Sequence, residues 1–302
     1  MTPATRVALV GATASGKSLA AHGAALECGH AEIVAVDAMT AYRGMDIGTA
    51  KPTRTDRAEV RYHLVDVLDP SEEMTVRRFQ ELCAAALDEI AGRGNTAVLV
   101  GGTGLYHRAV IDGLEIPPSF PEIRADLEAQ AGSPAGAARL HADLMALDPV
   151  AASRIDVANT RRVVRALEVV RATGRPFSSY GAGLEQYPAS PVAQIGITFD
   201  AAAVDAAIAR RFTAWMRAGL LDEVRGLLDA RGGLSRTARQ AVGYRQLIAH
   251  IEDAVPLEDA VAAAIAATRR LARRQWRWFR RDPRITWVPD APTAALALSE
   301  RL

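Results

Sequence analysis

Hydrophobic residues in the first hundred positions fall into four short runs separated by longer segments of helical pattern. Each run is short and mostly apolar, as expected for a strand buried inside a parallel sheet. The predicted strands are residues 6–10, 32–36, 62–68 and 96–100. Helices are predicted over 17–28, over 76–91 with Thr75 as the N-cap, and from Leu105. Strands that alternate with helices predict the α/β class, a parallel sheet with helices on both faces.

After Pro117 the strand pattern disappears and helical patterns replace it. Residues 117–192 contain predicted helices over 122–131, 136–147 and 160–172. A further strand is predicted at 193–199, followed by helices over 201–218, 220–230, 238–251 and 257–281. We therefore predict one α/β core formed by residues 1–116 and 193–302, interrupted by an all-helical insertion domain at 117–192.

The loop after the first predicted strand has the sequence G-x-x-x-x-G-K-S, the phosphate-binding P-loop, in the strand–loop–helix setting that this motif requires. Its residues are Gly11, Ala12, Thr13, Ala14, Ser15, Gly16, Lys17 and Ser18. Successive backbone N–H groups and the start of the following helix favour an anion, and Lys17 adds a full positive charge. Ser18 offers a hydroxyl ligand to a magnesium ion. The sequence therefore predicts a site for a diphosphate or triphosphate, with Mg²⁺ as the cofactor.

Composition limits the classes to which the protein can belong. Its 302 residues are 49% hydrophobic, enough for a full core, and its formal net charge is only +1. Nucleic-acid binding must then depend on a local cluster of charge. No apolar run approaches the ~20 residues of a membrane span, and two cysteines are too few for a zinc site or a disulfide framework. We expect a cytoplasmic monomer with no membrane anchor and no obligate protein partner.

Two polar residues follow other predicted strands. Asp37 ends the second strand, and Thr103 lies in a glycine-rich turn after the fourth. Because ligands collect at the carboxyl ends of parallel strands, both residues should face the P-loop. There Asp37 can act as a general base, bind magnesium, or merely cap its loop. The hydroxyl of Thr103 can approach a ligand closely, although such turns are also common without one.

Positive charge is concentrated at 269–284, where eight arginines accompany one aspartate, Asp282. Arginines recur at i, i+4 spacing along one predicted helix, and Trp276, Trp278 and Phe279 are interleaved with them. Guanidinium groups and aromatic rings suit contact with RNA phosphates and bases. The alternative is a solvated helix face whose aromatic residues belong to the core. We favour nucleic acid, because so many like charges repel one another without an anion.

Two further segments combine arginines with a helix start. They are Thr160, Arg161 and Arg162 in the predicted insertion, and Arg239, Gly243, Tyr244 and Arg245 in the C-terminal part. Helix N-termini and arginine clusters both bind phosphate, but an ordinary amphipathic helix is equally consistent with either segment. Tyr244 can stack on a base or fill the core.

Taken in order, these segments resemble the tRNA dimethylallyltransferase (tRNA isopentenyltransferase) family over nearly the whole chain. The segments that carry the resemblance are Gly11–Ser18, Asp37 with Tyr42–Lys51, Gly101–Tyr106, Thr160–Glu168, Thr173–Pro176, Ala241–Gln246 and Arg273–Arg280. A lone P-loop would say little, whereas this ordered set is highly specific.

The resemblance implies transfer of a dimethylallyl group from dimethylallyl diphosphate to N6 of the adenosine 3′-adjacent to the anticodon of tRNA, with release of diphosphate. It implies that the P-loop binds the prenyl diphosphate with Mg²⁺, that Asp37 is the general base, that Thr103 positions the base, and that Arg211 lies near the diphosphate. The insertion is expected to grip the anticodon stem. The implied tRNA contacts are Asp37, Ala38, Met39, Thr40, Thr103, Arg124, Thr160, Arg161, Arg162, Arg239, Gly243, Tyr244, Arg245, Arg274, Gln275 and Arg277.

Two positions depart from the family pattern, and other functions share some of these features. Tyr62 precedes His63 where a pair of histidines is common. Thr40 stands where the family usually has a glutamine able to bond a base edge. An adenylate (cytokinin-type) isopentenyltransferase would use a free nucleotide as acceptor, but it would not need a stem-binding surface. A P-loop kinase or ATPase would turn over ATP without prenyl diphosphate. A non-catalytic RNA-binding protein would leave the P-loop and Asp37 unexplained.

Overall fold

The computed structural model describes residues 6–181 and 184–302. The chain divides into two compact units. The larger unit is Met1–Asp112 with Ala189–Leu302, and the smaller is Gly113–Pro188. The expected insertion was 117–192. None of the helices in the described part of the chain is both long and apolar enough to cross a membrane.

The larger unit is built on a parallel sheet of six strands in the order β3-β2-β4-β1-β5-β6. The strands are β1 (Arg6–Val10), β2 (Ala31–Val36), β3 (Tyr62–His63), β4 (Thr96–Gly101), β5 (Ala193–Ile197) and β6 (Ile285–Val288). All six run in the same direction, so their carboxyl ends lie along one edge. The predicted α/β class with a parallel sheet is confirmed.

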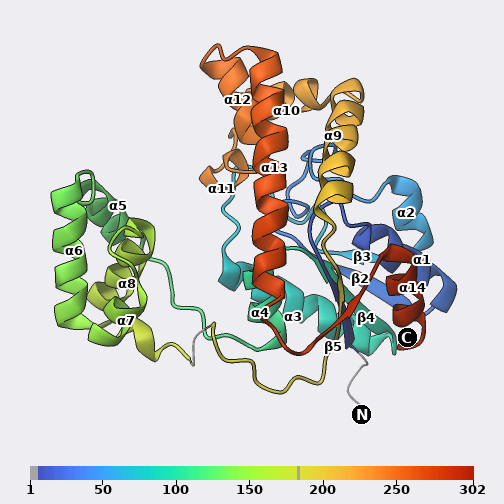
Figure 1. Cartoon of the computed structure of the whole chain (residues 1–302), viewed down its shortest axis with the longest axis horizontal. Coiled ribbons are helices and arrows are strands. Elements are labelled where there is room, and N and C mark those ends of the chain that lie inside the picture. The colour runs from blue at the N-terminus through green and yellow to red at the C-terminus, as the bar shows by residue number, and fades with distance from the viewer. Residues whose placement is uncertain (1–5, 182–183) are drawn as a thin grey trace. The chain divides into compact units, whose positions relative to one another are not determined.

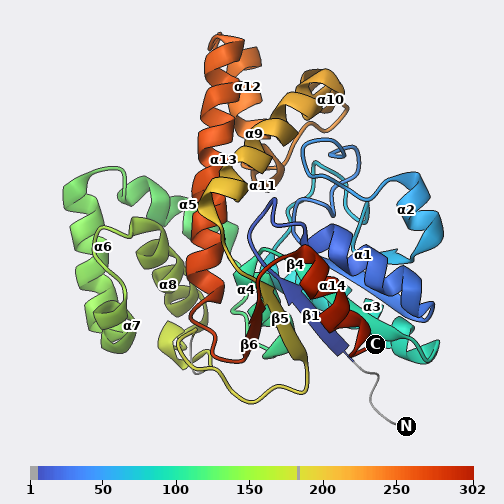
Figure 2. The ribbon, with the colours of Figure 1, turned by 45° about the vertical axis from the view of Figure 1, so that its right-hand side comes forward.

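Alternate residues of the central strands pack on opposite faces of the sheet, as the twofold period of a strand requires. Val7 and Leu9 face the helices α1 (Lys17–Cys28) and α14 (Ala291–Ser299), which lie side by side in Figure 2. Ala8 and Leu99 face the opposite way, into the larger apolar cluster. Helices therefore cover both faces, and this is why the strands read as continuous apolar runs.

The larger cluster is closed by helices from both halves of the unit. The first half contributes α3 (Val76–Gly92) and α4 (Gly104–Ile111), whereas α2 (Arg54–Glu59) buries none of its residues. The second contributes α9 (Ala201–Arg217), α10 (Leu220–Asp229), α11 (Arg236–Arg239), α12 (Tyr244–Glu252) and α13 (Leu257–Phe279). The long α13 packs beside α9 and α12 (Figure 1). Phe79, Phe212 and Tyr244 are the largest aromatic side chains buried here besides Tyr42.

The smaller unit is helical in its described residues. It contains α5 (Pro121–Gln130), α6 (Pro134–Leu147), α7 (Pro149–Arg154), α8 (Thr160–Thr173) and a short 3-10 turn at Phe177–Ser179. Leu127, Leu140 and Leu167 form its own apolar core. The carboxylate of Glu168 is fully buried and pairs with Arg124 at 2.9 Å and Arg165 at 2.8 Å. A charge is tolerated in this core because two guanidinium groups neutralise it.

Besides α2, α7 and α14, for which no helix was predicted, three elements differ from the sequence prediction. The strand predicted over 62–68 ends at His63, because Leu64 and Asp66 adopt left-handed backbone conformations with φ of 62° and 57°. The helix predicted over 238–251 is broken into α11 and α12 by Gly243, whose φ is 98°. The C-terminal part was predicted to be entirely helical after 201, yet it supplies β6, a four-residue edge strand.

A buried acid ties three neighbouring strands together at the end of the sheet opposite the P-loop. Glu32, on β2, accepts hydrogen bonds from Arg93 at 2.8 Å, His63 at 2.7 Å and Asn95 at 2.7 Å. Burial alone would raise the pKa of Glu32, but these hydrogen bonds and the charge of Arg93 lower it to about 2. The ionised carboxylate therefore stabilises the pairing of β3, β2 and β4.

This cluster predicts a pH-dependent contribution to stability. The folded-state pKa lies below the unfolded value of 4.5, so the contribution is complete above that pH and is lost as the pH falls toward about 2. Glu32→Gln should lower the free energy of unfolding at pH 7 by about 2 kcal/mol and flatten the acid limb of the stability profile. Denaturant unfolding from pH 7 to pH 3 measures both. The exposed Glu185→Gln is the matched control, and equal profiles for the two variants would contradict the assignment.

Candidate active site and nucleic-acid interface

The P-loop connects the end of β1 to the start of α1, as predicted. Ala14 and Gly16 adopt left-handed backbone conformations, with φ of 63° and 86°. Where left-handed residues alternate with residues of right-handed backbone conformation, successive backbone N–H groups point toward the same concavity. The Nζ of Lys17 donates to the carbonyl of Ala12 at 3.2 Å, which holds the ammonium over the loop. The loop therefore has the form of an anion cradle.

Arg211 reaches this loop from α9, where the sequence resemblance placed it. Its Nη2 donates to the Thr13 hydroxyl at 2.8 Å, and its guanidinium stacks on the ring of Trp215 at 4.6 Å. The Nε of Arg211 and the hydroxyl of Ser15 are buried without a hydrogen-bond partner among the described residues. Buried polar groups are normally paired, so these two fit a ligand with oxygen acceptors.

Burial makes the charged forms of Lys17 and Arg211 less favourable than they are in water. It lowers the pKa of Lys17 to about 8, and Arg211 lowers it further while the charge of Asp37 acts in the opposite direction. Burial likewise lowers the pKa of Arg211 to about 10. Desolvated like charges are unfavourable until an anion neutralises them, so the site is electrostatically prepared for a multiply charged ligand.

Asp37 follows β2 and faces the same cradle. Its Oδ1 accepts a hydrogen bond from the backbone N–H of Met39 at 2.8 Å, and no described residue bonds the other oxygen. Burial raises the pKa of Asp37, although the Met39 bond and the charge of Lys17 oppose that rise. A carboxylate with a raised pKa and one free oxygen suits proton transfer at this position.

The turn after β4 forms a third side of the site. A methyl group built on Gly102 would come within 3.2 Å of the Gly11 carbonyl, so this turn lies directly against the P-loop. Thr103 is half-buried, and its hydroxyl makes no hydrogen bond within the described part of the chain. The ends of β1, β2 and β4 therefore meet, as the parallel arrangement predicted.

Ser18 meets the requirements for a magnesium ligand. Its side chain is exposed at the start of α1, and nothing in residues 6–181 or 184–302 hydrogen-bonds its hydroxyl. Magnesium prefers oxygen ligands and is commonly shared between a protein hydroxyl and phosphate oxygens. The residue and its place beside the cradle therefore fit the predicted cation.

The loop that follows Asp37 is held in place by two charged side chains, those of Lys51 and Glu223. The ammonium of Lys51 donates to the Tyr42 carbonyl and to Asp46 and Asp66, each carboxylate at 2.6 Å. The carboxylate of Glu223 accepts from the backbone N–H groups of residues 46, 47 and 48, at 3.0, 2.8 and 3.5 Å. Ala38 and Thr40 are buried in the first turn of this loop, where the Thr40 hydroxyl donates to the Asp37 carbonyl at 3.1 Å. The loop is thus a fixed wall of the site.

The arginines of α13 divide into paired and free groups. Arg273 pairs with Asp205 at 2.7 Å and Arg269 with the same carboxylate at 3.9 Å, while Arg284 pairs with Asp112 and Asp282 at 2.6 Å. Five others are exposed and form no ion pair with a described residue: Arg270, Arg274, Arg277, Arg280 and Arg281. We call these five the arginine face. It concentrates unneutralised charge that suits a phosphate backbone.

The aromatic residues of this segment are part of the core, which corrects their expected place at an RNA surface. Trp276 packs between Phe199 and Trp287, with ring centroids 6.1 and 4.8 Å away. Phe279 is buried, and Trp278 packs against the same cluster. Their spacing along α13 places them on its inward side, so only arginines face outward.

Two residues expected to contact tRNA have internal roles instead. Tyr244 is fully buried, its hydroxyl donates to Glu223, and its ring fills the space beside Gly48, where a methyl group would lie 2.6 Å away. Gln275 turns inward, and its Oε1 accepts from the backbone N–H of Thr13 at 2.7 Å. Tyr244 therefore has no surface to offer a base, and the amide of Gln275 belongs to the P-loop.

The remaining predicted contacts lie in two places. In the smaller unit, Arg161 and Arg162 are exposed at the start of α8 beside Thr160, whereas Arg124 is bound to buried Glu168. In the larger unit, Arg245 is exposed, Arg239 pairs with Glu252, and Gly243 forms the break between α11 and α12. Their tRNA contacts stay predictions.

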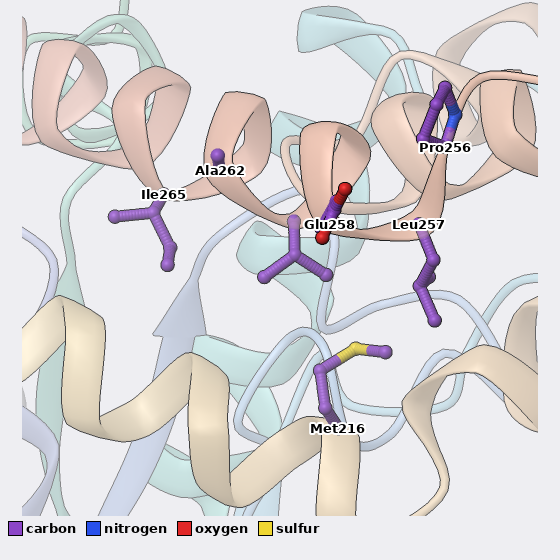
Figure 3. A pocket seen from close by; sticks show the side chains of 7 residues that line it. Met216, Pro256, Leu257, Glu258, Ala262 and Ile265 are labelled. Carbon is purple, nitrogen blue, oxygen red and sulfur yellow. The ribbon is translucent and has the colours of Figure 1, made fainter.

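An apolar groove of about 740 Å³ lies between α9 and the first half of α13. Met216 projects from α9 toward Leu257 of α13, and Ile265 lines the groove farther along the same helix (Figure 3). Ile265 precedes Gln275 by ten residues, about 15 Å along the helix axis, so the groove lies at the other end of α13 from the P-loop contact. None of the predicted site residues lines it.

Sequence reasoning missed two residues that shape the site. Trp215 stacks on Arg211, and its i+4 spacing on a predicted helix was a usable signal. Glu223 binds three backbone N–H groups of a distant loop, and no local pattern distinguishes it from other helical acids.

Comparisons with known proteins agree over most of the chain. The family model for IPP transferase matches residues 40–282. A tRNA dimethylallyltransferase of Nocardioides sp. is 45% identical over 285 residues, 93% of this chain and 90% of the relative. One from Salinispora tropica is 43% identical over 301 residues, 99% of this chain and 92% of the relative.

A solved structure extends the likeness to three dimensions. The full-length tRNA isopentenylpyrophosphate transferase from Bacillus halodurans superposes with a TM-score of 0.69 at 35% identity. The alignment covers 98% of this chain and 94% of that one. The likeness therefore includes both units of the chain.

Burial of Lys17 predicts that anion binding depends on pH. The ammonium is needed to bind a phosphate, and its pKa in the free protein is about 8. The affinity for inorganic diphosphate should be nearly constant below about pH 7 and should fall about tenfold by about pH 9. Titration calorimetry of the wild type and Lys17→Met at about pH 7 and about pH 9 measures the affinity at each pH. The variant shows how much of the change comes from deprotonation of the diphosphate itself, and the difference between the two proteins is the contribution of Lys17. Equal pH dependence in the two proteins would contradict this role for Lys17.

Proposed function

Since the chain belongs to the IPP transferase family, we propose that it transfers a dimethylallyl group from dimethylallyl diphosphate to N6 of the adenosine 3′-adjacent to the anticodon of tRNA. The observation that carries the proposal is the meeting of a cationic P-loop with Asp37 at one edge of the sheet. Lys17 and Arg211 suit the diphosphate, and Asp37 suits the proton of the attacking amine. The diphosphate and the attacking amine would then each meet a suitable group at the same edge of the sheet.

The reaction needs help at both ends of the transferred group. The exocyclic amine of adenine is a weak nucleophile because its lone pair is delocalised into the ring. As the N6–carbon bond forms, the allylic carbon–oxygen bond breaks and the diphosphate leaves with the bonding pair. The P-loop N–H groups, Lys17 and Arg211 stabilise the charge that develops on the leaving oxygen. Asp37 accepts the amine proton, and Thr103 lies where its free hydroxyl can orient the base.

Magnesium is the cofactor that we propose for the leaving group. Ser18 would hold it, because its hydroxyl is free and lies at the start of α1 beside the cradle. When bound, the cation would neutralise charge on the diphosphate. The protein residues bind and orient the diphosphate in this arrangement.

The arginine face is the observation that favours an RNA over a free nucleotide as the acceptor. Five unpaired guanidinium groups exceed what a free nucleotide needs, and they suit the backbone of a folded RNA. We propose that the arginine face and the start of α8, at Thr160, Arg161 and Arg162, contact the anticodon stem-loop. The target base must leave its stack to reach Asp37, as bases do in other enzymes that modify them. We place this reaction in the cytoplasm.

One assay separates the proposed function from its alternatives. Labelled dimethylallyl diphosphate is incubated with Mg²⁺ and an unmodified anticodon stem-loop, with AMP and ATP as parallel acceptors. We expect the label only in the RNA. Label in the nucleotides would indicate a cytokinin-type enzyme, and ATP consumption without transfer would indicate a kinase or ATPase.

Asp37→Asn tests the general base. Asparagine keeps an acceptor for the Met39 N–H but cannot take a proton at neutral pH. Single-turnover transfer should fall about 10²- to 10⁴-fold, while affinity for the stem-loop changes less than about twofold. In the wild type, the rate should rise with pH through the raised pKa of Asp37. Transfer at the wild-type rate would show that another group removes the proton.

The double variant Arg274→Ala/Arg277→Ala tests the arginine face. Each lost phosphate contact weakens RNA binding and removes about one unit of slope from the plot of log K against log salt. The double variant should therefore bind the stem-loop more weakly, with a salt slope lower by about 1.5 to 2. Arg54→Ala, an exposed arginine on α2, is the matched control. An unchanged slope would place the RNA elsewhere on the protein.

A further inference from the structure

Gln275 joins the arginine-rich helix to the P-loop. Its Oε1 accepts from the backbone N–H of Thr13 at 2.7 Å, across 262 positions of sequence. The hydroxyl of the same threonine accepts from Arg211 on α9 at 2.8 Å. Both polar groups of Thr13 are therefore held by the C-terminal half of the chain, and the shape of the loop depends on where α9 and α13 lie.

The turn after β4 is shaped to admit the Gln275 side chain. A methyl group on Gly102 would lie 2.5 Å from Nε2 of Gln275 and 3.1 Å from its Cδ, closer than packed atoms allow. The amide thus fits between the P-loop and the Gly102 turn, touching two of the three strand ends that form the site. Such a close contact fixes the position of the Gln275 side chain against the P-loop.

The opposite side of the same helix is the arginine face. Arg274 and Arg277 flank Gln275 in sequence and are exposed, whereas Gln275 is partly buried. Buried Ala272 and Phe279 anchor this part of α13 to the core. A ligand that engages the outward arginines therefore restrains the helix that carries the inward glutamine.

We propose that Gln275 is a positioning residue that couples RNA binding on the arginine face to diphosphate binding in the P-loop. RNA on α13 holds Gln275 in place, Gln275 holds the Thr13 backbone, and the cradle then keeps the geometry that accepts a diphosphate. The inference rests on the proposed function, because it takes RNA and diphosphate as the two ligands. By thermodynamic linkage, the diphosphate must tighten RNA binding by the same factor.

The coupling is measured with inorganic diphosphate and Mg²⁺, titrated with and without an unmodified anticodon stem-loop. Gln275→Met keeps the length and volume of the side chain but removes the acceptor. The ratio of diphosphate affinities with and without RNA should be about fivefold smaller in this variant than in the wild type. RNA affinity without diphosphate should change less than about twofold, and the thermal midpoint should stay close to that of the wild type.

Two further variants separate this role from a general loss of structure. Gly102→Ala should displace the amide and reduce the ratio in the same way, with little added effect in the Gln275→Met background. Gln275→Glu keeps an acceptor for the Thr13 N–H, so it should retain the ratio while its charge weakens diphosphate binding overall. Gln130→Met, an exposed glutamine on α5, should match the wild type.

The possible outcomes distinguish a failure of this inference from a failure of the proposed function on which it rests. Binding of both ligands with equal ratios in the wild type and Gln275→Met would overturn the inference and leave the proposed function standing. A wild type that binds neither the stem-loop nor diphosphate would overturn the proposed function, and the inference with it. A reduced ratio in Gln275→Met and Gly102→Ala, but not in Gln275→Glu, would establish the positioning role.

Discussion

Two cations buried against one short loop impose the constraint on which the rest of this structure depends. Lys17 and Arg211 lose hydration and repel each other, and burial lowers the pKa of both side chains. Such a pair persists only if the surrounding fold fixes it firmly. The Thr13 hydroxyl, the Trp215 ring and the carboxylate of Asp37 supply that restraint from three different elements. The unfavourable electrostatics of the cradle become favourable when an anion binds.

The sequence was sufficient for features that depend on local pattern and insufficient for those that depend on distant partners. β1, β2, β4 and the P-loop were predicted because buried parallel strands and phosphate loops have short-range signatures. The strand at 62–68 failed because the ion pairs of Asp66 with Lys51 and Arg57 favour an irregular backbone there. β6 was missed because four residues after an arginine-rich helix carry too little pattern. From the pattern alone, site residues were placed together where they ended a predicted strand, whereas Arg211 on α9 was placed beside the P-loop by the family resemblance.

The arginine-rich helix shows why composition alone misleads. A mixture of arginines and tryptophans suggested an RNA surface, yet the helix sorts the two types onto opposite sides. The same lesson applies to Lys51. In a chain with only two lysines, its ammonium makes three hydrogen bonds to oxygen atoms, which the planar guanidinium of arginine would reach less well. In both places the packing, and not the composition, distinguishes a binding surface from a structural support.

The P-loop is synthesised before every segment that supports it from the C-terminal half. Arg211 and Gln275 hold Thr13, and Ala291 at the start of α14 packs so close to Gly16 that a methyl group there would lie 2.8 Å away. A nascent chain still growing on the ribosome therefore carries the whole anion-binding motif without its finished geometry. The cradle gains its cationic partner and its shape only when these later helices dock, so synthesis itself delays the appearance of a competent site until α14 has emerged.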